Sequence, residues 1–441
     1  MTTSTVFLSL SIALLSGLLL SRLAKLVNLP AVTAYLIAGI LIGPFLLGRL
    51  GVSGLGFNSL HQVESFSILC DLALGFIAFA IGNEFRMSQL KQIGKQATVI
   101  GILQAVVTTL LVDAVLIALH FAMPDILPLP VAIVLGAIAA ATAPAATLMV
   151  VKQYKAKGPV TTILLPIVAL DDAVGLVLFA VSFGVAKSIG AGNVNLLSVV
   201  LEPILEVVLS LLLGLVMGIL FNYMERFFHS RSKRLAVSVG FVMITVAISS
   251  LTFNVGGIHV AFSSLLACMM LGTVFCNVCD FSEELMDRVD RWTAPLFILF
   301  FVISGAELNL NVFSSWTIVL IGVVYIITRS IGKCTGAFAS SKMMKCDSNI
   351  VKYLGITLLP QAGVALGMAS KAASATTGIA GGELILNITL FAILVYEIVG
   401  PFLTKVALTK AGEIKPEGKT SARHEHAKKM AAEKVDHQVS K

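Results

Sequence analysis

The sequence predicts an all-α polytopic membrane protein with about thirteen transmembrane helices, arranged as inverted repeats that contain two broken crossing helices. The first observation is composition: of 441 residues, 57% are hydrophobic and only 12% are charged, whereas a soluble domain carries about 25% charged residues. The second is a series of long apolar runs, each able to cross roughly 30 Å of hydrocarbon as a helix. The third is a pair of interruptions in these runs, accompanied by buried acids.

The apolar runs place the helices along the chain. We expect helices near residues 5–26, 31–49, 66–85, 97–121, 129–151, 159–186, 195–223, 234–254, 257–278, 293–307, 314–340, 350–371 and 382–409. Residues 1–410 then form one membrane domain, with repeats over approximately 31–186 and 257–409 and linker helices over 195–254. The remainder, 411–441, is rich in Lys, Glu and His, so we expect a polar, solvated cytoplasmic tail.

The basic residues predict the orientation of these helices. If the N-terminus lies outside, nearly all of the 31 Lys and Arg residues fall in the loops, helix ends and tail on the inside. This asymmetry follows the positive-inside rule. We therefore expect a multi-pass protein of the inner cell membrane with a cytoplasmic C-terminus. The net charge of +7 is explained by this topology, and no nucleic-acid partner is expected.

A short repeated motif indicates the inverted repeat. The segment "GNEFRM" (82–87) ends the third predicted helix on the inside, and "GAELNL" (305–310) ends the tenth on the outside. Both have the pattern Gly-x-Glu followed by alternating apolar residues. A motif that recurs with opposite orientation is typical of transporters with inverted-topology repeats.

The fifth and twelfth predicted helices are interrupted at corresponding places. Pro144 breaks "ATAPAAT" (141–147), and Pro360, followed by Gly363, breaks "LLPQAGVALG" (358–367). A proline removes a backbone donor and clashes with the preceding turn. Paired breaks indicate half-helices that cross near the membrane midplane, where freed carbonyls can meet a cation and side chains can neutralise the helix dipoles.

The adjacent acids Asp171 and Asp172 are the strongest functional signal, because a carboxylate at the bilayer centre costs roughly 2.5–3.5 kcal/mol. They lie about 100° apart around a helix, so they face different partners. One can pair with the fixed cation Lys333 while the other points into a water-filled cavity. Arg329 shares the helix face of Lys333. Two cations need two anions, so we predict that Glu397 forms a supporting charged pair with Arg329.

The other polar residues in the apolar runs are interpreted as structural. Asp71 and Asp113 adjoin no helix break, so we expect them to have structural partners. Gln104 is interpreted as a satisfied packing residue. Glu84 and Glu307 lie near helix ends and are expected to cap or anchor those ends.

At these residues the sequence resembles the sodium/hydrogen exchanger family, and most of all its bacterial cation:proton antiporters. The segments that carry the resemblance are "LPAVTAYLIAGILIGP" (29–44), "FAIGNEFRMSQLKQIGK" (79–95), "LDDAVGL" (170–176), "GKCTGAF" (332–338) and "LLPQAGVALGMA" (358–369). The resemblance covers roughly residues 5–409. It implies the sodium/proton antiporter fold, a homodimer, and alternating access by an elevator-like displacement of a mobile core domain.

The resemblance also implies roles for single residues. It makes Asp172 the main carrier of cation or protons and pairs Asp171 with Lys333 when the cation is absent. It makes Thr142 a ligand in the first crossed helix, so Asp171, Asp172 and Thr142 would hold the transported Na⁺. The Asp pair with Lys is the combination found in electrogenic relatives.

The sequence departs from the family pattern at two positions near the breaks. Ala143 stands where relatives often carry Ser or Asp, which removes a ligand and bears on sodium selectivity. Gln361 stands where many relatives carry Arg. The tail also lacks a nucleotide-binding domain of the kind that regulates many potassium efflux relatives.

The predicted function is secondary active transport that exchanges protons for Na⁺ or Li⁺, with charge movement and no enzymatic step. No cofactor is expected, and the partners are monovalent cations, protons, the bilayer and a second copy of the chain. The alternatives are a K⁺/H⁺ or electroneutral antiporter, a receptor or gating subunit, and an intramembrane aspartyl protease. A protease needs two carboxylates that face each other across helices and share a proton, whereas adjacent residues on one helix diverge.

Overall fold

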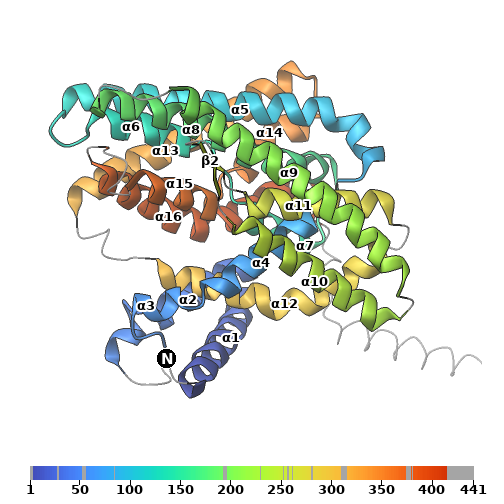
Figure 1. Ribbon diagram of the computed structural model, residues 1–441. Helices are drawn as coiled ribbons and strands as arrows, with labels where there is room; N and C mark the ends of the chain where they lie inside the picture. The colour runs from blue at the N-terminus through green and yellow to red at the C-terminus, as the bar shows by residue number, and fades with distance from the viewer. Residues whose placement is uncertain are drawn as a thin grey trace, which may run out of the picture.

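A computed structural model of the chain describes residues 3–26, 29–51, 56–83, 85–191, 196–228, 230–251, 253–255, 258–260, 262–279, 282–308, 315–373, 379 and 381–414. Within these ranges the fold is almost entirely helical (Figure 1). Each predicted helix has a counterpart in the expected order. Nine described helices are long and apolar enough to cross a membrane, and shorter apolar helices lie between them.

The first part of the chain contains the following elements: α1 (Thr3–Leu26), α2 (Ala31–Ile42), η1 (Leu47–Leu50), α3 (Leu60–Glu64), α4 (Ser67–Asn83), α5 (Met87–Ala122), α6 (Leu129–Ile138), α7 (Pro144–Tyr154), α8 (Pro159–Ala191), α9 (Leu196–Arg226) and α10 (Arg231–Ser249). The break between α6 and α7 lies where it was predicted. Pro144 is tolerated there because it occupies the first turn of α7, where its missing N–H has no intrahelical partner to lose.

The second part contains β1 (Phe253–Val255), β2 (Ile258–Val260), α11 (Ser264–Val278), α12 (Ser282–Glu307), α13 (Trp316–Met343), α14 (Ser348–Thr357), α15 (Gly363–Ala373) and α16 (Gly382–Lys410). The helix predicted over 257–278 starts later, because β1 and β2 form an antiparallel hairpin before it and Ser263 caps α11. The helix predicted over 293–307 starts earlier, because the first turns of α12 are polar and escape a search for apolar runs.

The helices form two bundles that differ in their contacts. In Figure 1 the upper group contains α5, α6, α8 and α13 to α16, and the lower group contains α1 to α4, α10 and α12. We call α5–α8 with α13–α16 the core bundle, since α5 packs on α6, α8 and α13, and α13 on α14 and α16. We call α1, α2, α4 and α9–α12 the flanking bundle, since α12 packs on α2 and α4, and α11 on α4 and α9.

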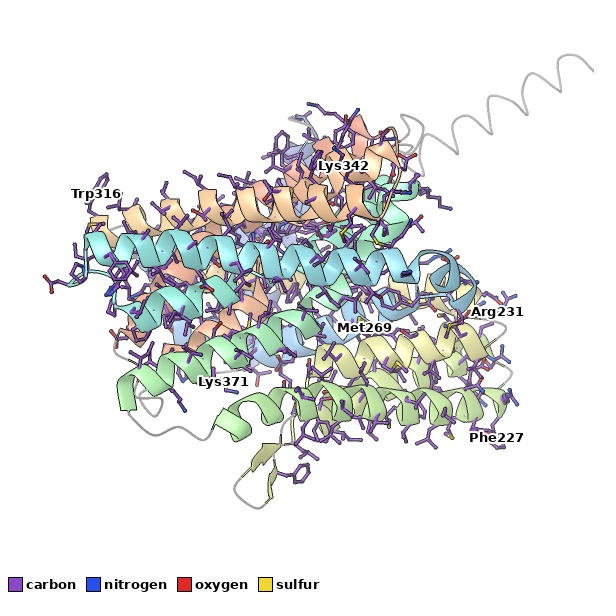
Figure 2. The ribbon with its side chains drawn as sticks, turned by 90° about the horizontal axis from the view of Figure 1, so that it is seen from above. Phe227, Arg231, Met269, Trp316, Lys342 and Lys371 are labelled. Carbon is purple, nitrogen blue, oxygen red and sulfur yellow. The ribbon has the colours of Figure 1, made fainter. Side chains whose placement is uncertain are left out.

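Successive long helices alternate in direction, so the molecule has two opposite ends. Trp316, at the start of α13, lies at one end, while Arg231 and Phe227 lie at the other (Figure 2). We call these ends the Trp316 face and the Arg231 face. Helix α12 ends beside α3 just before α13 begins, which places α3 at the Trp316 face.

Close packing of α13 on α5 brings charged residues into the core bundle. A Cβ atom at Gly332 would lie 2.9 Å from the Cα atom of Thr108, and one at Gly336 would lie 2.9 Å from the Cα atom of Gln104. These glycines therefore let the two backbones approach closely. The approach positions Lys333, next to Gly332 in the chain, against the breaks.

The segment after α16 differs from the predicted tail. Glu413, expected to be solvated, is only 4% exposed. Its carboxylate accepts hydrogen bonds from the backbone N–H groups of Val160, at 2.6 Å, and Thr161, at 2.8 Å. These N–H groups lie in the first turn of α8 and have no intrahelical acceptor. Residues 411–414 thus belong to the folded domain, and 415–441 lie outside the described residues.

Candidate functional site

The two broken helices meet at a crossing in the core bundle. Helix α6 ends at Ile138 and α14 ends at Thr357, while their continuations, α7 and α15, begin at Pro144 and Gly363. The backbone N–H of Ala143 donates to the carbonyl oxygen of Pro360 at 2.8 Å, which ties one break to the other. The helix breaks predicted at Pro144, Pro360 and Gly363 are therefore confirmed.

Asp171 and Lys333 form a fully buried ion pair beside this crossing. Lys333 Nζ lies 2.9 Å from Asp171 Oδ2, and neither side chain is exposed. Lys333 also donates to the carbonyl oxygen of Ala140 at 2.5 Å and to Thr142 Oγ1 at 2.9 Å. The predicted pairing of Asp171 with Lys333 is confirmed, and the ammonium group also binds the polar atoms of the first break.

Two further side chains complete the surroundings of Asp171. The Thr142 hydroxyl donates to Asp171 Oδ2 at 2.7 Å. The Gln104 amide donates to Asp171 Oδ1 and, at 3.0 Å, to the carbonyl oxygen of Gly101. Gln104 was interpreted as a packing residue, so its role here was missed. The signal that could have identified it is the cost of burying an amide in the apolar run of α5 without a partner.

Asp172 lies one residue further on α8 and is in a different environment. Its side chain is 1% exposed, and neither carboxylate oxygen has a hydrogen-bond partner among the residues the structure describes. Thr142, which was expected to act with both acids, and Lys333 both contact Asp171. The site therefore contains one satisfied carboxylate and one unpartnered carboxylate on the same turn.

The predicted ion pair between Arg329 and Glu397 is wrong. Arg329 donates from Nε to the carbonyl oxygen of Ala139 at 3.0 Å, from Nη1 to that of Leu359 at 2.7 Å, and from Nη2 to that of Ala141 at 2.6 Å. These carbonyls lie at the two helix breaks, where no intrahelical donor reaches them. The guanidinium group neutralises the C-terminal ends of α6 and α14. Side chains were expected to neutralise these dipoles, and in the structure Arg329 does so.

Gln361 contributes to the same arrangement. It is fully buried, and its amide donates to the carbonyl oxygen of Ile138 at 2.9 Å and to the Tyr325 hydroxyl at 3.1 Å. Relatives that carry Arg at this position would place a charge in the second break. In this chain Arg329 supplies that charge from α13, and the neutral Gln361 bonds the last carbonyl of α6.

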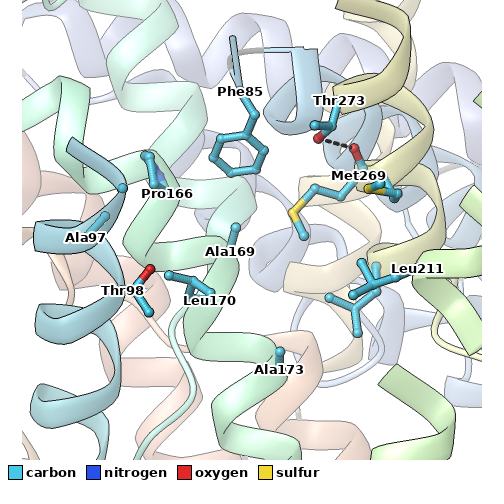
Figure 3. A pocket seen from close by; sticks show the side chains of 13 residues that line it. Phe85, Ala97, Thr98, Pro166, Ala169, Leu170, Ala173, Leu211, Met269 and Thr273 are labelled. Carbon is cyan, nitrogen blue, oxygen red and sulfur yellow. Dashed lines mark hydrogen bonds between the residues drawn. The ribbon is translucent and has the colours of Figure 1, made fainter. Parts of the chain in front are cut away.

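A cavity of about 280 Å³ lies beside the stretch of α8 that carries the two acids, although neither Asp171 nor Asp172 lines it. It lies between the core bundle and the flanking bundle, and residues of both line it: Phe85, Ala97, Pro166, Ala169, Leu170, Ala173, Leu266 and Met269 (Figure 3). Ala169 and Ala173 lie on the turns of α8 that flank Asp172. The lining is mostly apolar and contains no charged side chain.

The donors at the crossing are oxygens, which suit a hard cation rather than a soft transition metal. Within the described part of the chain, no three His, Cys, Asp or Glu side chains converge as a metal site would require. Asp171, Asp172, Thr142 and the carbonyl of Ala140 are the groups that could hold a monovalent cation. Lys333 occupies part of this space with its own positive charge.

Comparisons with known proteins agree with this arrangement. The sodium/hydrogen exchanger transmembrane family model matches residues 10–410. The Na⁺/H⁺ antiporter NhaS4 of Synechocystis sp. is 23% identical over 358 residues, covering 78% of this chain and 83% of the relative. The sodium proton antiporter MjNhaP1 of Methanocaldococcus jannaschii has a similar fold at 19% identity. One of its structures gives a TM-score of 0.65 over 91% of this chain and 95% of that chain, and another gives 0.73 over 94% and 100%.

These findings decide between the alternative functions. The family consists of transporters, so the protease alternative is excluded and the chain is not an enzyme. The family and its antiporter relative support exchange of cations for protons across a membrane. The match spans most of the membrane domain and includes both breaks and both acids. The chain therefore belongs to the sodium/hydrogen exchanger family.

Proposed function

We propose that this protein exchanges protons for Na⁺ or Li⁺ electrogenically, by alternating access of a site formed by Asp171, Asp172 and Thr142. The observation that carries the proposal is the contrast between the two acids. Asp171 is held by Lys333, Thr142 and Gln104, whereas Asp172 is equally buried and has no hydrogen-bond partner among the described residues. A buried carboxylate without a fixed partner is suited to hold an exchangeable proton or cation.

The proposed exchange is a competition for carboxylate oxygens. A cation that binds Asp172 displaces its proton and draws Asp171 and the Thr142 hydroxyl toward it. Lys333 then gives up its contact with Asp171 and releases a second proton, which a Lys can do and an Arg cannot. Two protons for one cation move one net charge per cycle. Arg329 donates its hydrogen bonds to carbonyls of the breaks, so the cation that pairs with Asp171 is Lys333.

The division into two bundles supports the proposed alternating access. All residues of the proposed site belong to the core bundle, which we propose moves against a flanking bundle that forms a homodimer. At the Arg231 face, Lys152 of α7 pairs with Asp290 of α12 at 2.7 Å, and Gln153 of α7 accepts the backbone N–H of Ala31 at 2.8 Å. These contacts join the bundles and must break when the core moves. We place the Arg231 face in the cytoplasm of a cell with the protein in its inner membrane, because basic residues gather there.

The second candidate is a K⁺/H⁺ or electroneutral antiporter with the same site. Ala143 favours it, because this residue provides no side-chain oxygen that could act as a cation ligand. A site with one oxygen fewer selects less strictly for a small cation.

Proteoliposomes test both candidates. The purified chain, with a pH-sensitive dye inside the vesicles, receives pulses of Na⁺, Li⁺ and K⁺ in turn. We expect proton flux with Na⁺ and Li⁺ and little with K⁺. Flux with K⁺ alone would favour the second candidate, and no flux with any of the three cations would contradict the exchange itself.

A further inference from the structure

Asn277, at the end of α11, holds the link between α4 and α5 with both ends of its side-chain amide. Its Nδ2 atom donates to the carbonyl oxygen of Phe85 at 2.8 Å, and its Oδ1 atom accepts the backbone N–H of Met87 at 2.7 Å. These two groups lie on either side of Arg86, so one side chain fixes the path of the backbone over three residues. The thiol of Cys276 donates to the same carbonyl of Phe85 at 3.5 Å.

The start of α5 depends on this contact. Met87 is the first residue of α5, so its N–H has no acceptor within the helix. The side chain of Arg86, which precedes the helix, does not cap it. Asn277 supplies the acceptor from another helix instead. Asn277 is exposed, so water could satisfy its amide, and burial does not explain why both ends of the amide bind the link.

The base on which the link rests is rigid, because α4 and α11 pack backbone to backbone. A Cβ atom at Gly82 would lie 1.9 Å from the carbonyl oxygen of Met269, and one at Gly272 would lie 2.2 Å from that of Phe79. Only glycine permits so close an approach. Asn277 follows Gly272 in the same helix, so it belongs to this rigid pair.

The link also carries the chain from one bundle to the other. Helix α4 belongs to the flanking bundle and α5 to the core bundle, and residues 85–86 lie between them. The passages from α8 to α9, at 192–195, and from α12 to α13, at 309–314, lie outside the described residues. When one bundle moves against another, a few residues of such a connection absorb the change in backbone torsion angles.

The joint at Asn277 differs from the contacts of Lys152 and Gln153 at the same face. Those contacts connect α7 with α12 and with the start of α2, which are distant in the chain, so they separate when the core moves. Phe85, by contrast, lies two residues after the end of α4. The short chain and the α4–α11 packing keep it beside Asn277 in every position of the core.

We propose that Asn277 is a positioning residue of the exchange, which holds the link at 85–87 as a hinge about which the core bundle moves. A hinge transmits movement only while its fixed side stays in place, and the amide keeps it there. This inference rests on the proposed alternating access and adds to it a residue that binds no ion.

A substitution separates the hinge from the ion site. Asn277→Leu removes both hydrogen bonds at a similar side-chain volume. In proteoliposomes we expect the maximal Na⁺-driven proton flux to fall about fivefold, as for two hydrogen bonds at the low end of their usual net contribution. The half-saturating Na⁺ concentration should stay unchanged, because the acids are untouched.

Thr273→Val is the matched control for this substitution. Thr273 lies one turn earlier on α11, and its hydroxyl donates to the carbonyl oxygen of Met269 in the same helix at 2.9 Å. Neither the maximal flux nor the half-saturating concentration should change. If Asn277→Leu does not fold, Asn277→Asp keeps the acceptor for Met87 and loses only the donor to Phe85. It should then show a smaller fall in maximal flux, again at an unchanged half-saturating concentration.

A cross-link distinguishes a hinge, which stays closed, from a contact that must open. Asn277→Cys combined with Met87→Cys is bridged by a short bismaleimide at two exposed positions. A hinge tolerates this bridge, so the flux of the variant should be kept or raised toward wild type. Lys152→Cys combined with Asp290→Cys, bridged in the same way, should lose its flux. Wild type treated with the reagent controls for the six native cysteines.

The outcomes separate the hinge from the exchange on which it rests. If the bridge between positions 87 and 277 stops the flux, the hinge is overturned and the exchange stands. The same holds if Asn277→Leu keeps the maximal flux or acts on the half-saturating concentration instead. If the bridge between positions 152 and 290 leaves the flux unchanged, the movement of the bundles is overturned together with the hinge. Absence of cation-driven flux in wild type would overturn the exchange itself.

Discussion

Asp171 and Asp172 are identical residues one position apart on α8, yet their surroundings are opposite. Asp171 has partners at both carboxylate oxygens, and Asp172 has none among the described residues. The cause is helix geometry, since about 100° of rotation directs one side chain to α13 and the other away from it. A helix can therefore present one carboxylate that is fully hydrogen-bonded and, one residue later, one that has no described partner.

The largest expected effect comes from neutralising the two acids separately. Asp172→Asn should abolish exchange with little loss of stability, because no described partner is left behind. Asp171→Asn should instead leave Lys333 as an uncompensated buried charge, at a cost of roughly 3–5 kcal/mol. Flux in proteoliposomes and thermal unfolding in detergent measure the two effects. Near-normal flux in Asp172→Asn would contradict the proposed difference in role between Asp171 and Asp172.

Lys333→Gln sharpens the comparison by freeing Asp171 from its cation. With no ammonium proton to release, we expect slower exchange and no net charge movement. In wild type, a potential of about 100 mV contributes roughly 2.3 kcal/mol per charge, equivalent to a cation gradient of around 40-fold. Currents on solid-supported membranes measure this charge. If active wild-type protein gives no transient current after a cation jump, the two-for-one scheme is wrong and the electroneutral candidate gains.

The separation of Arg329 from Glu397 predicts a smaller effect, on stability. Arg329→Gln should lower the free energy of unfolding by about 3 kcal/mol, because carbonyls at both breaks lose charged donors. Glu397→Gln should change it little. The losses of the double variant should add within about 0.5 kcal/mol, as for residues that share no interaction. A coupling energy well above that value, measured by thermal unfolding, would show that Arg329 and Glu397 interact directly after all.

Thr142→Val is expected to have the smallest effect. It keeps the shape of the side chain but removes the hydroxyl that donates to Asp171 and accepts from Lys333. The half-saturating cation concentration should rise about three- to tenfold, the range for the net contribution of one ordinary hydrogen bond, while the maximal rate changes less. An unchanged half-saturating concentration would show that the hydroxyl orients Asp171 without binding the cation.

The sequence was sufficient for features that depend on local patterns. Apolar runs placed the helices, Pro144 and Pro360 placed the breaks, and the buried charges indicated that one of the two acids pairs with Lys333. The family resemblance, and not the residues alone, assigned that pairing to Asp171. Partners that depend on how helices cross were missed. Arg329 was predicted to pair with a carboxylate because the acidic residues can be read from the sequence. The backbone carbonyls that lose their intrahelical donors at the breaks cannot be read from it. Gln104 was missed for the same reason, since its partner lies on another helix.

The cap formed by Glu413 attaches the end of the membrane domain to α8, the helix that carries Asp171 and Asp172. The Glu413 carboxylate binds the first turn of α8, and Asp171 lies about eleven residues, or ~16 Å, further along the same helix, beyond Pro166. The chain that follows Ile414 is therefore connected through this cap to the helix that carries the two acids. A chain shortened after Ile414 keeps this cap. One shortened before Glu413 leaves the N–H groups of Val160 and Thr161 without their acceptor and removes this connection to the helix that carries Asp171 and Asp172.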